Sequence, residues 1–466
     1  MEDRSVGRIA LFIAILAGFL GPFDISAVNI ALPTIGAEFS LDALALSWVS
    51  TAYLLSSALF LVPFGRIADI VGRKRIFTLG LSLFTAASLA MALTVMPATL
   101  IPLRVIQGMG GALIYGTAVA ILTAVTPPED RGKALGIYTT AVYVGLSIGP
   151  FLGGFMTGAF GWRSIFLVNV PTGLFALWLV RTRLHGEWAD ARGESFDTPG
   201  SLLYGLSLVA VMLGFTWLPG PPGIVMILLG VLLLAGFVRR EQGTRHPLLD
   251  VGLFSGNRVF ALSNLAALIN YSATFAVTFF LSFYLQSIRG FSPAAAGAIL
   301  VTQPILQAVF SSPAGRLSDR VEPGKVASAG MGLCALGLLL LAFIREDTPL
   351  SFLLLALALL GTGFALFSSP NTNAVMSSVE RRCYGVASGT LGTMRYVGQM
   401  LSMGIAMTLF AVHIGRVEIG PANYPGLLAA IQAGFLIFTI LCVIGIYPSL
   451  ARGNMRDQEK AGCRVS

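Results

Sequence analysis

An aspartate interrupts the first long apolar run of this sequence: Asp24 lies in the middle of the stretch Ile9–Ala31. An ionisable side chain at the depth of a bilayer costs several kcal/mol unless it is paired, protonated or facing water. Membrane proteins keep such groups mainly along the paths of protons, ions and solutes. Asp24 is therefore a candidate for a residue that takes up and releases a proton.

A second charged residue, Arg104, lies in the apolar run Ala98–Ala124. If that run enters the membrane from the outside, Arg104 sits at a depth comparable to that of Asp24. Burial favours the protonated acid and a nearby arginine favours the carboxylate, and the sequence does not say which effect is larger. The two residues predict a proton-controlled switch. The alternatives are a static structural pair and an arginine that reaches the interface.

Polar and aromatic residues within the apolar runs are candidates for the wall of a substrate cavity, because amphiphilic ligands suit a mixed apolar wall with a few polar groups. In the first half they are Ser26, Asn29, Tyr53, Gln107, Tyr115, Tyr138 and Tyr143. In the second half they are Asn264, Asn270, Tyr271, Gln303, Gln307, Asn371, Asn373, Arg395 and Gln399. Each could instead bond neighbouring helices to one another.

Arg395 is the lone cation within a second-half run, and it either meets an anionic group of the substrate or holds its helix in place. No Asp or Glu lies within a second-half run, so proton coupling rests on Asp24 nearly alone. An exporter of dications would favour two membrane acids. A monocationic, zwitterionic or neutral lipophilic substrate is therefore the expectation.

Membrane-spanning helices must position these residues, because the composition is that of a polytopic membrane protein. The chain has 466 residues, of which 55% are hydrophobic and only 11% are charged, and its mean hydropathy is +0.81. Soluble domains carry about 25% charged residues. The net charge of +8 comes from basic residues in short loops, so membrane topology explains it without nucleic acid.

Fourteen apolar runs are long enough to span a bilayer, although the seventh and eighth are short. They are Ile9–Ala31, Leu44–Phe64, Ile76–Met96, Ala98–Ala124, Ala134–Gly158, Ile165–Val180, Ser201–Trp217, Ile224–Val238, Phe260–Leu285, Ala294–Pro313, Val326–Ile344, Leu350–Met376, Val386–Ala411 and Leu427–Ile446. The predicted fold class is an all-α polytopic membrane protein.

The distribution of basic residues orients these spans. With a cytoplasmic N-terminus, four of the 30 lysines and arginines lie outside (Arg163, Arg289, Arg345 and Arg416), two lie within spans, and the other 24 lie inside. This is a strong positive-inside bias, and it would weaken if one span were missed or invented. Both termini are therefore expected in the cytoplasm. The first run is too long for a signal-peptide core and is expected to remain as a spanning helix.

The two halves of the chain repeat each other. Pro63–Asp69 reappears as Pro313–Asp319, and glycines at 132, 136 and 145 reappear at 385, 389 and 398. The nearly equal offsets align the second span with the tenth and the fifth with the thirteenth. The repeat unit therefore has six helices, with spans seven and eight inserted between the copies. Such a duplication predicts a substrate site near mid-membrane between the halves, with rocking as the access mechanism.

The predicted domains follow from this repeat. Residues 1–183 form an N-terminal six-helix bundle, and residues 184–258 form a linker with two additional helices. Residues 259–450 form a C-terminal six-helix bundle, and residues 451–466 form a cytoplasmic tail.

A glycine- and arginine-containing segment, Gly65–Arg75, joins the second and third spans on the predicted cytoplasmic side. Asp69 can cap a helix or pair with an arginine. The pattern predicts a gating latch, whereas a plain positive-inside loop would need only the arginines. The latch residues are Gly65, Arg66, Asp69, Gly72 and Arg73, with Gly315, Arg316 and Asp319 in the repeat.

The fifth span is rich in glycine and contains a proline, which predicts a kinked helix that packs closely against its neighbours. The residues concerned are Gly145, Gly149, Pro150, Gly153 and Gly154.

These motifs carry a family resemblance. Gly65–Arg75 resembles the cytoplasmic signature of the major facilitator superfamily, Arg104–Gly108 resembles its helix-4 arginine motif, and Gly145–Gly154 resembles the helix-5 motif of its antiporters. Three further segments resemble the fourteen-helix drug:proton antiporter branch, which holds multidrug-resistance-type exporters. They are Asp24–Pro33, Gly161–Pro171 and the segment from His246 to Asp250.

The resemblance covers essentially the whole chain and implies secondary active transport, export and proton coupling. Small-molecule substrates, protons and the lipid bilayer are the expected partners, with no cofactor and no ATP. A multi-pass protein of the cell membrane that acts as a monomer is expected. The branch also contains exporters of metabolites and antibiotics, so the resemblance does not name the substrate.

Three other functions stay open. An importer or uniporter on the same fold would use Asp24 to bind substrate instead of a proton. A non-transporting sensor or scaffold is disfavoured by the many polar residues in the spans and by the short loops. An enzyme is disfavoured because the sequence contains no nucleotide-binding Gly-Lys-Ser/Thr loop and no credible catalytic triad among its three histidines. Cys334, Cys383, Cys442 and Cys463 predict neither a disulfide nor a metal site.

Overall fold

The computed structural model describes residues 2–127, 130–249, 251–380 and 384–453, and within these ranges it is helical with no strand. The first half contains α1 (Glu2–Phe39), α2 (Ala43–Val71), α3 (Arg73–Ala92), α4 (Pro97–Val125), α5 (Arg131–Phe160) and α6 (Arg163–Thr182). The inserted segment contains α7 (Thr198–Trp217), α8 (Pro221–Glu241) and the short α9 (Gly252–Gly256).

The second half contains α10 (Arg258–Thr274), α11 (Ala276–Phe283), a π-helical turn η1 (Tyr284–Ile288), α12 (Pro293–Leu300), α13 (Thr302–Arg320), α14 (Pro323–Leu341), α15 (Leu350–Ser377), α16 (Tyr384–His413), the 3-10 turn η3 (Pro421–Asn423) and α17 (Tyr424–Ala451). The described residues form fourteen segments long and apolar enough to cross a membrane, which confirms the fourteen predicted spans.

Two predicted spans are not single α-helices. The ninth span changes from α10 to α11 at Phe275 and ends in η1, and the tenth changes from α12 to α13 at Val301. Pro304 explains the second break, because proline lacks a backbone donor and crowds the carbonyl four residues earlier. At the first break, the backbone N–H of Ala276 donates to the Ser402 hydroxyl of α16 at 3.1 Å.

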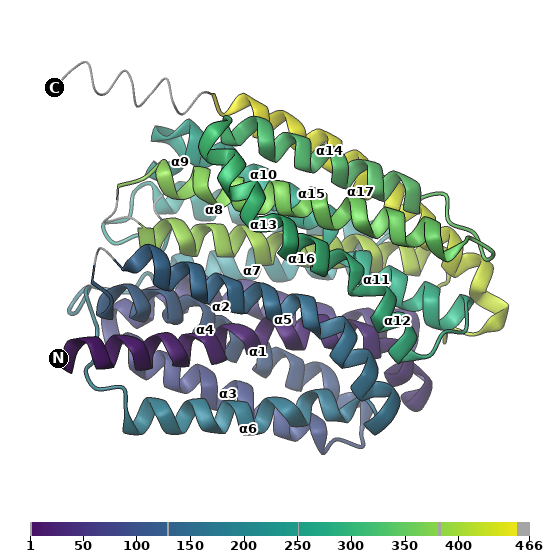
Figure 1. Cartoon of the computed structure of the whole chain (residues 1–466), viewed down its shortest axis with the longest axis horizontal. Helices are drawn as coiled ribbons and strands as arrows, with labels where there is room; N and C mark the ends of the chain where they lie inside the picture. The colour runs from purple at the N-terminus through teal and green to yellow at the C-terminus, as the bar shows by residue number, and fades with distance from the viewer. Residues whose placement is uncertain (1, 128–129, 250, 381–383, 454–466) are drawn as a thin grey trace.

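The two halves pack their helices in the same way, which confirms the duplicated architecture. In the first half α1 packs against α5 and α6, and α4 packs against α2 and α3. In the second half α10 packs against α16 and α17, and α15 packs against α13 and α14. Figure 1 shows the halves as two bundles, purple to blue and green to yellow. Between them, α2 lies against α16 while α5 lies against α12 and α13.

The inserted pair lies at the junction of the halves. α7 and α8 pack against each other, and α7 also contacts α2 and α16. Most of the large apolar side chains of α8 remain exposed. The helices α2 and α16 pack against each other between the two halves, and α7 contacts both of them. The inserted pair therefore covers one side of the interface between the halves.

The helices alternate in direction, so α1 begins and α17 ends at the same end of the molecule (Figure 1). We call it the signature end, because it carries Gly65–Arg75, and we call the other end the opposite end. The signature segment differs from the predicted loop: residues 65–71 are the last turns of α2, and only Gly72 separates α2 from α3. Gly72 has φ = 132°, a backbone region that favours glycine.

Candidate functional site

Asp24 lies in the middle of α1 with none of its surface exposed. Its carboxylate accepts a hydrogen bond from Arg104 Nη1 at 2.5 Å, and the two residues form an ion pair. The other carboxylate oxygen accepts from Gln107 Nε2 at 3.0 Å and from Asn169 Nδ2 at 2.9 Å. Three donors, one of them charged, therefore satisfy both oxygens of a fully buried carboxyl group.

The arginine has further partners that do not depend on the acid. Arg104 Nε donates to the carbonyl oxygen of Val49 at 2.9 Å, and Nη1 also donates to Gln107 Oε1 at 2.6 Å. Its guanidinium carbon lies 4.6 Å from the centre of the Tyr53 ring. Arg104 therefore keeps neutral partners when Asp24 is protonated, which is a requirement for a pair that exists in two charge states.

A polar network extends the ion pair through the first bundle. Gln107 Nε2 also donates to Ser88 Oγ at 2.9 Å, so four helices contribute side chains. We call Asp24, Ser88, Arg104, Gln107 and Asn169 the Asp24 cluster. Sequence reasoning missed Ser88 and Asn169 as members. The available signal for Asn169 was an amide within an apolar span, inside the motif Gly161–Pro171.

The central cavity lies between the halves and on another face of α1. It has a volume of about 90 Å³, and six predicted cavity residues line it, namely Ser26, Asn29, Tyr271, Gln303, Gln307 and Gln399. Tyr271, Phe275 and Phe364 add aromatic surface. Asp24 is not among the lining residues, and neither are Tyr53 and Gln107, which belong to the surroundings of the ion pair. That these two residues line the substrate cavity stays a prediction.

Two of the cavity amides have unused hydrogen-bonding atoms. Gln307 Nε2 and Gln399 Oε1 are buried without a partner among the described residues. In contrast, Asn29 Oδ1 accepts from Ser50 at 2.6 Å, and Ser26 Oγ donates to the carbonyl of Leu146 at 2.8 Å. The cavity therefore offers one free donor and one free acceptor on its second-half wall.

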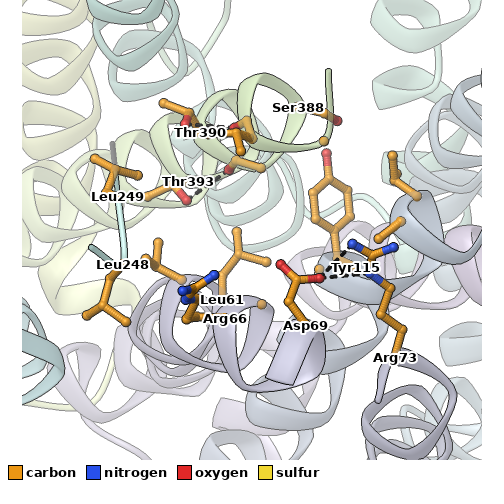
Figure 2. A pocket seen from close by; sticks show the side chains of 18 of the residues that line it. Leu61, Arg66, Asp69, Arg73, Tyr115, Leu248, Leu249, Ser388, Thr390 and Thr393 are labelled. Carbon is orange, nitrogen blue, oxygen red and sulfur yellow. Dashed lines mark hydrogen bonds and ion pairs between the residues drawn. The ribbon is translucent and has the colours of Figure 1, made fainter. Parts of the chain in front are cut away.

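A larger cavity, of about 290 Å³, lies nearer the signature end. Figure 2 shows its wall: the Asp69 and Arg73 side chains point toward each other beside Tyr115, and Thr390 and Thr393 come from α16. Asp69 and Arg73 form an ion pair at 2.7 Å. The cavity thus brings four predicted latch residues, Gly65, Arg66, Asp69 and Arg73, together with Tyr115, a predicted cavity residue.

The linker before α7 holds the signature segment in place. The backbone N–H of Ala191 donates to the Asp69 carbonyl at 2.9 Å, Arg73 also pairs with Asp190 at 2.8 Å, and Lys74 Nζ donates to the Leu184 carbonyl at 2.5 Å. Residues 184–197 contain no helix, so no interfacial helix forms there. In this conformation Arg66, Asp69 and Arg73 are thus each bound to the linker.

A small charged cluster connects this linker to the segment after α8. Arg66 pairs with Glu194, and His246 Nδ1 lies 2.7 Å from the same carboxylate. The hydrogen bond from Arg66 lowers the pKa of Glu194 below its usual value. Nearby, Arg240 pairs with Asp197 at 2.8 Å. The repeated residues Gly315, Arg316 and Asp319 lie in the last turns of α13 at the same end.

The glycine-rich face of α5 forms a seam with α1 and α12. A Cβ atom on Gly153 would lie 2.7 Å from Ala27 of α1, and one on Gly154 would lie 2.3 Å from the Pro293 carbonyl oxygen. From the other side, a Cβ on Gly297 would lie 2.2 Å from the Pro150 carbonyl oxygen. The predicted close packing of this motif is therefore present, within a single continuous α-helix. Gly145 and Gly149 pack against α1 in the same manner.

Further contacts join the halves toward the opposite end. Gln286 Nε2 of η1 donates to the Ile30 carbonyl at 2.8 Å, and the backbone N–H of Ala43 donates to the Val417 carbonyl at 3.1 Å. Beyond Ile30 lies a third cavity of about 390 Å³, lined by Pro33, Gln286 and other residues. The seam and these hydrogen bonds thus close the space between the halves at the opposite end.

Three other predicted cavity residues line neither of the two inner cavities. Asn371 bridges Arg452 Nη1 at 2.9 Å and the Ser263 carbonyl at 3.1 Å, so it holds helices together near the signature end. Asn270 Nδ2 contacts Cys442 Sγ at 4.0 Å, and Tyr138 packs against Gly18. Cys334 and Cys442 are buried free thiols, whereas Cys383, Cys463 and most of the predicted tail lie outside the described residues.

The fold and the site define a class: a membrane transporter built from two similar helical bundles, with a buried ion pair in one and a cavity between them. The family model described as Major Facilitator Superfamily matches residues 14–401 and 263–461. The chain belongs to the Major Facilitator Superfamily.

Similar proteins support this assignment. The chain is 30% identical over 441 residues to the riboflavin transporter RibZ of Clostridioides difficile, covering 94% of this chain and 96% of that one. It is 31% identical to the multidrug resistance protein Stp of Mycobacterium tuberculosis, covering 86% and 76%. A solved bacterial homologue of the human lysosomal transporter Spinster shares the fold with a TM-score of 0.65, at 18% identity and with 96% and 97% coverage.

Proposed function

We propose that this protein exports small amphiphilic or lipophilic compounds in exchange for protons, and that Asp24 is the proton-binding group. The observation that carries the proposal is the Asp24 cluster. Its acid is fully buried, is matched by one arginine, and lies within one of the two bundles. Protonation of the acid leaves the buried charge of Arg104 without its counter-charge, and the neutral hydrogen bonds that Arg104 retains reduce the cost of that state.

Coupling between proton and substrate runs through α1. Asp24 faces the first bundle, while Ser26 and Asn29 of the same helix face the central cavity. Protonation of Asp24 removes its charge from Arg104, which changes how α1 packs against α4. The same helix carries cavity wall, so a change in its packing alters the substrate site without direct contact between proton and substrate.

The transport cycle then has four steps. In the outward-facing state Asp24 takes a proton from outside, which disfavours retained substrate. The protein returns to the inward-facing state, and the proton leaves as a new substrate binds. The loaded protein then reopens to the outside. A proton gradient drives this cycle without ATP or any other cofactor.

The orientation and setting belong to the same proposal. The protein lies in the cytoplasmic membrane as a monomer. Its signature end faces the cytoplasm. Lysines and arginines concentrate at the signature end, and loops rich in these residues usually face the cytoplasm.

The test is substrate-induced proton movement in proteoliposomes, with a panel of lipophilic cations, zwitterions and neutral drugs. Wild-type protein should release protons when a substrate is added, and Asp24→Asn should release none. Asp42→Asn is the matched control, because Asp42 caps α2 at the opposite end and asparagine caps a helix equally well. Proton release that survives in Asp24→Asn would refute the assignment of the coupling group.

A second candidate is a transporter of a metabolite, and one observation favours it: RibZ, a relative over nearly the whole chain, is named a riboflavin transporter. Riboflavin therefore belongs in the panel. A uniporter, or an importer that is not coupled to protons, would continue to transport its substrate after the pH gradient is removed. A non-transporting sensor would move none of the compounds.

A further inference from the structure

Arg395 lies on α16 between the two inner cavities. Its guanidinium carbon is 5.3 Å from the centre of the Tyr271 ring and 6.0 Å from that of Tyr115. Tyr271 lines the central cavity, and Tyr115 lines the cavity near the signature end. Tyr396 meets the Tyr115 ring edge-on at 5.7 Å. A cation surrounded by tyrosines from both halves thus separates the two cavities.

Arg395 has fewer polar partners than the two fully buried arginines, Arg104 and Arg452. Arg104 pairs with Asp24, and Arg452 donates to Ser263 and Asn371. For Arg395 the structure records no ion pair with any carboxylate of the described ranges, and its Nε has no hydrogen-bond partner there. Its side chain is half-buried.

The walls on either side add complementary groups. Gln399 lies one turn along α16 from Arg395, and its free acceptor faces the central cavity together with the free donor of Gln307. Thr393 of the same helix lines the other cavity. A ligand at this position would meet a cation, aromatic faces and two unused amide atoms.

We propose that Arg395 and the tyrosines Tyr115, Tyr271 and Tyr396 bind the anionic group of a planar aromatic substrate, such as an aromatic carboxylate or a zwitterion. A guanidinium matches a carboxylate with two parallel hydrogen bonds, and tyrosine faces stack on flat rings. The inference rests on the proposed transport function, which it deepens by naming a class of substrate. Among the substrates expected from the sequence, it favours the zwitterionic class over the cationic and neutral ones.

The size of the cavities is consistent with this position. Sites for drug-sized ligands usually measure about 300–1,000 Å³, and the central cavity alone has about 90 Å³. Displacement of the layer around Arg395 would join it to the cavity of about 290 Å³. A substrate that displaces Arg395 on binding would therefore join the two cavities and occupy the combined space.

The experiment is equilibrium binding to the purified full-length protein in lipid nanodiscs, without any proton gradient. The probes are matched pairs of planar aromatic carboxylic acids and their methyl esters, including coumarin-3-carboxylic acid. At least one acid should bind about tenfold more tightly than its ester, which corresponds to about 1.4 kcal/mol. This preference should vanish in Arg395→Gln and survive in part in Arg395→Lys, which keeps the charge but loses the planar fork.

Three controls make the outcome decisive. Binding of the esters should be unchanged in Arg395→Gln, which shows that the variant is folded. Asp42→Asn should keep the preference for the acid, because Asp42 caps α2 at the opposite end and lines neither inner cavity. Inorganic phosphate should not displace the bound acid at equal concentration, since it has no ring to stack.

Equal binding of acids and esters, no binding of any acid, or a preference that persists in Arg395→Gln would overturn the inference. Failure of the proton-exchange proposal is distinguishable, because it would show as proton movement by Asp24→Asn while the binding preference stayed intact.

Discussion

Asp24 and Arg104 illustrate how far single residues reveal a site. Both are charged residues in apolar runs, which is rare enough that their pairing was predictable. Their surroundings were less so, because an asparagine in a spanning segment usually serves helix packing, and Asn169 could not be told from such a residue. The separation of Asp24 from the cavity wall could have been predicted from the sequence. Ser26 and Asn29 lie about 200° and 140° around a helix from Asp24, at about 100° per residue, so they face away from it.

At the residue scale, the ion pair of Asp197 predicts how the stability of the folded protein depends on pH. Asp197 caps α7, and its pKa lies below the usual value of 3.8 because Arg240 donates hydrogen bonds to it. A carboxylate with a lowered pKa in the folded state stabilises that state above pH 3.8, and the contribution disappears as the pH falls through the folded-state pKa.

Asp197→Asn keeps the helix cap and removes the charge pair. We expect it to lower the thermal unfolding temperature in detergent at neutral pH, by an amount that shrinks to nothing as the pH falls below 3.8. Unfolding measured across that pH range compares the two proteins. A deficit of the same size at low pH would contradict the assigned role of the ion pair.

At the scale of helices, local sequence explains one break and not the other. Pro304 lies just beyond the break at Val301, so that break was readable from the sequence. Neither proline nor glycine lies beside the break at Phe275. There the backbone N–H of Ala276 donates to the Ser402 hydroxyl of α16, a helix distant in the sequence. Such a break depends on tertiary contact and cannot be read from its own segment.

The seam between α5 and α12 makes a prediction about gating. Gly154→Ala places a methyl group 2.3 Å from the Pro293 carbonyl oxygen, so the helices must separate at the opposite end. We expect transport to fall about tenfold or more, and a cysteine at Thr278 in the central cavity to react faster with a membrane-impermeant maleimide applied from that end.

Gly158→Ala is the matched control on the same helix. Its added methyl group would lie 3.8 Å from Ala294, an ordinary contact distance, so neither transport nor labelling should change. If both variants behaved alike, close packing at Gly154 would not be what closes this end.

At the scale of the whole molecule, the duplication was the most predictable property. Motifs repeated at nearly one offset imply two copies of one packing pattern, and the structure has that pattern. Which end is closed was not predictable, because one sequence must encode both an inward-open and an outward-open arrangement. The closed opposite end depends on contacts between halves that no repeat within a half specifies.

Alternating access requires the opposite end to open during each cycle, and a reversible cross-link tests this. Ala43 and Val417 face each other across the halves, with the Ala43 N–H bonded to the Val417 carbonyl. Cysteines at both positions, in a background without the four native cysteines, should form a disulfide under oxidation. Transport in proteoliposomes should then stop and return on reduction.

Each single-cysteine variant should remain active under oxidation. Transport that continued with the disulfide formed would mean that the substrate path does not require the halves to part at Ala43 and Val417.

The neutrality of the Asp24 cluster has a further, electrical consequence. With Asp24 ionised, its charge and that of Arg104 cancel, so membrane voltage exerts no net force on this pair. With Asp24 protonated, the pair carries one positive charge, and a potential negative inside favours its movement toward the cytoplasm by about 2.3 kcal/mol per 100 mV for a full crossing. Voltage would thus assist the proton-loaded return step and leave the proton-free step unaffected by this pair.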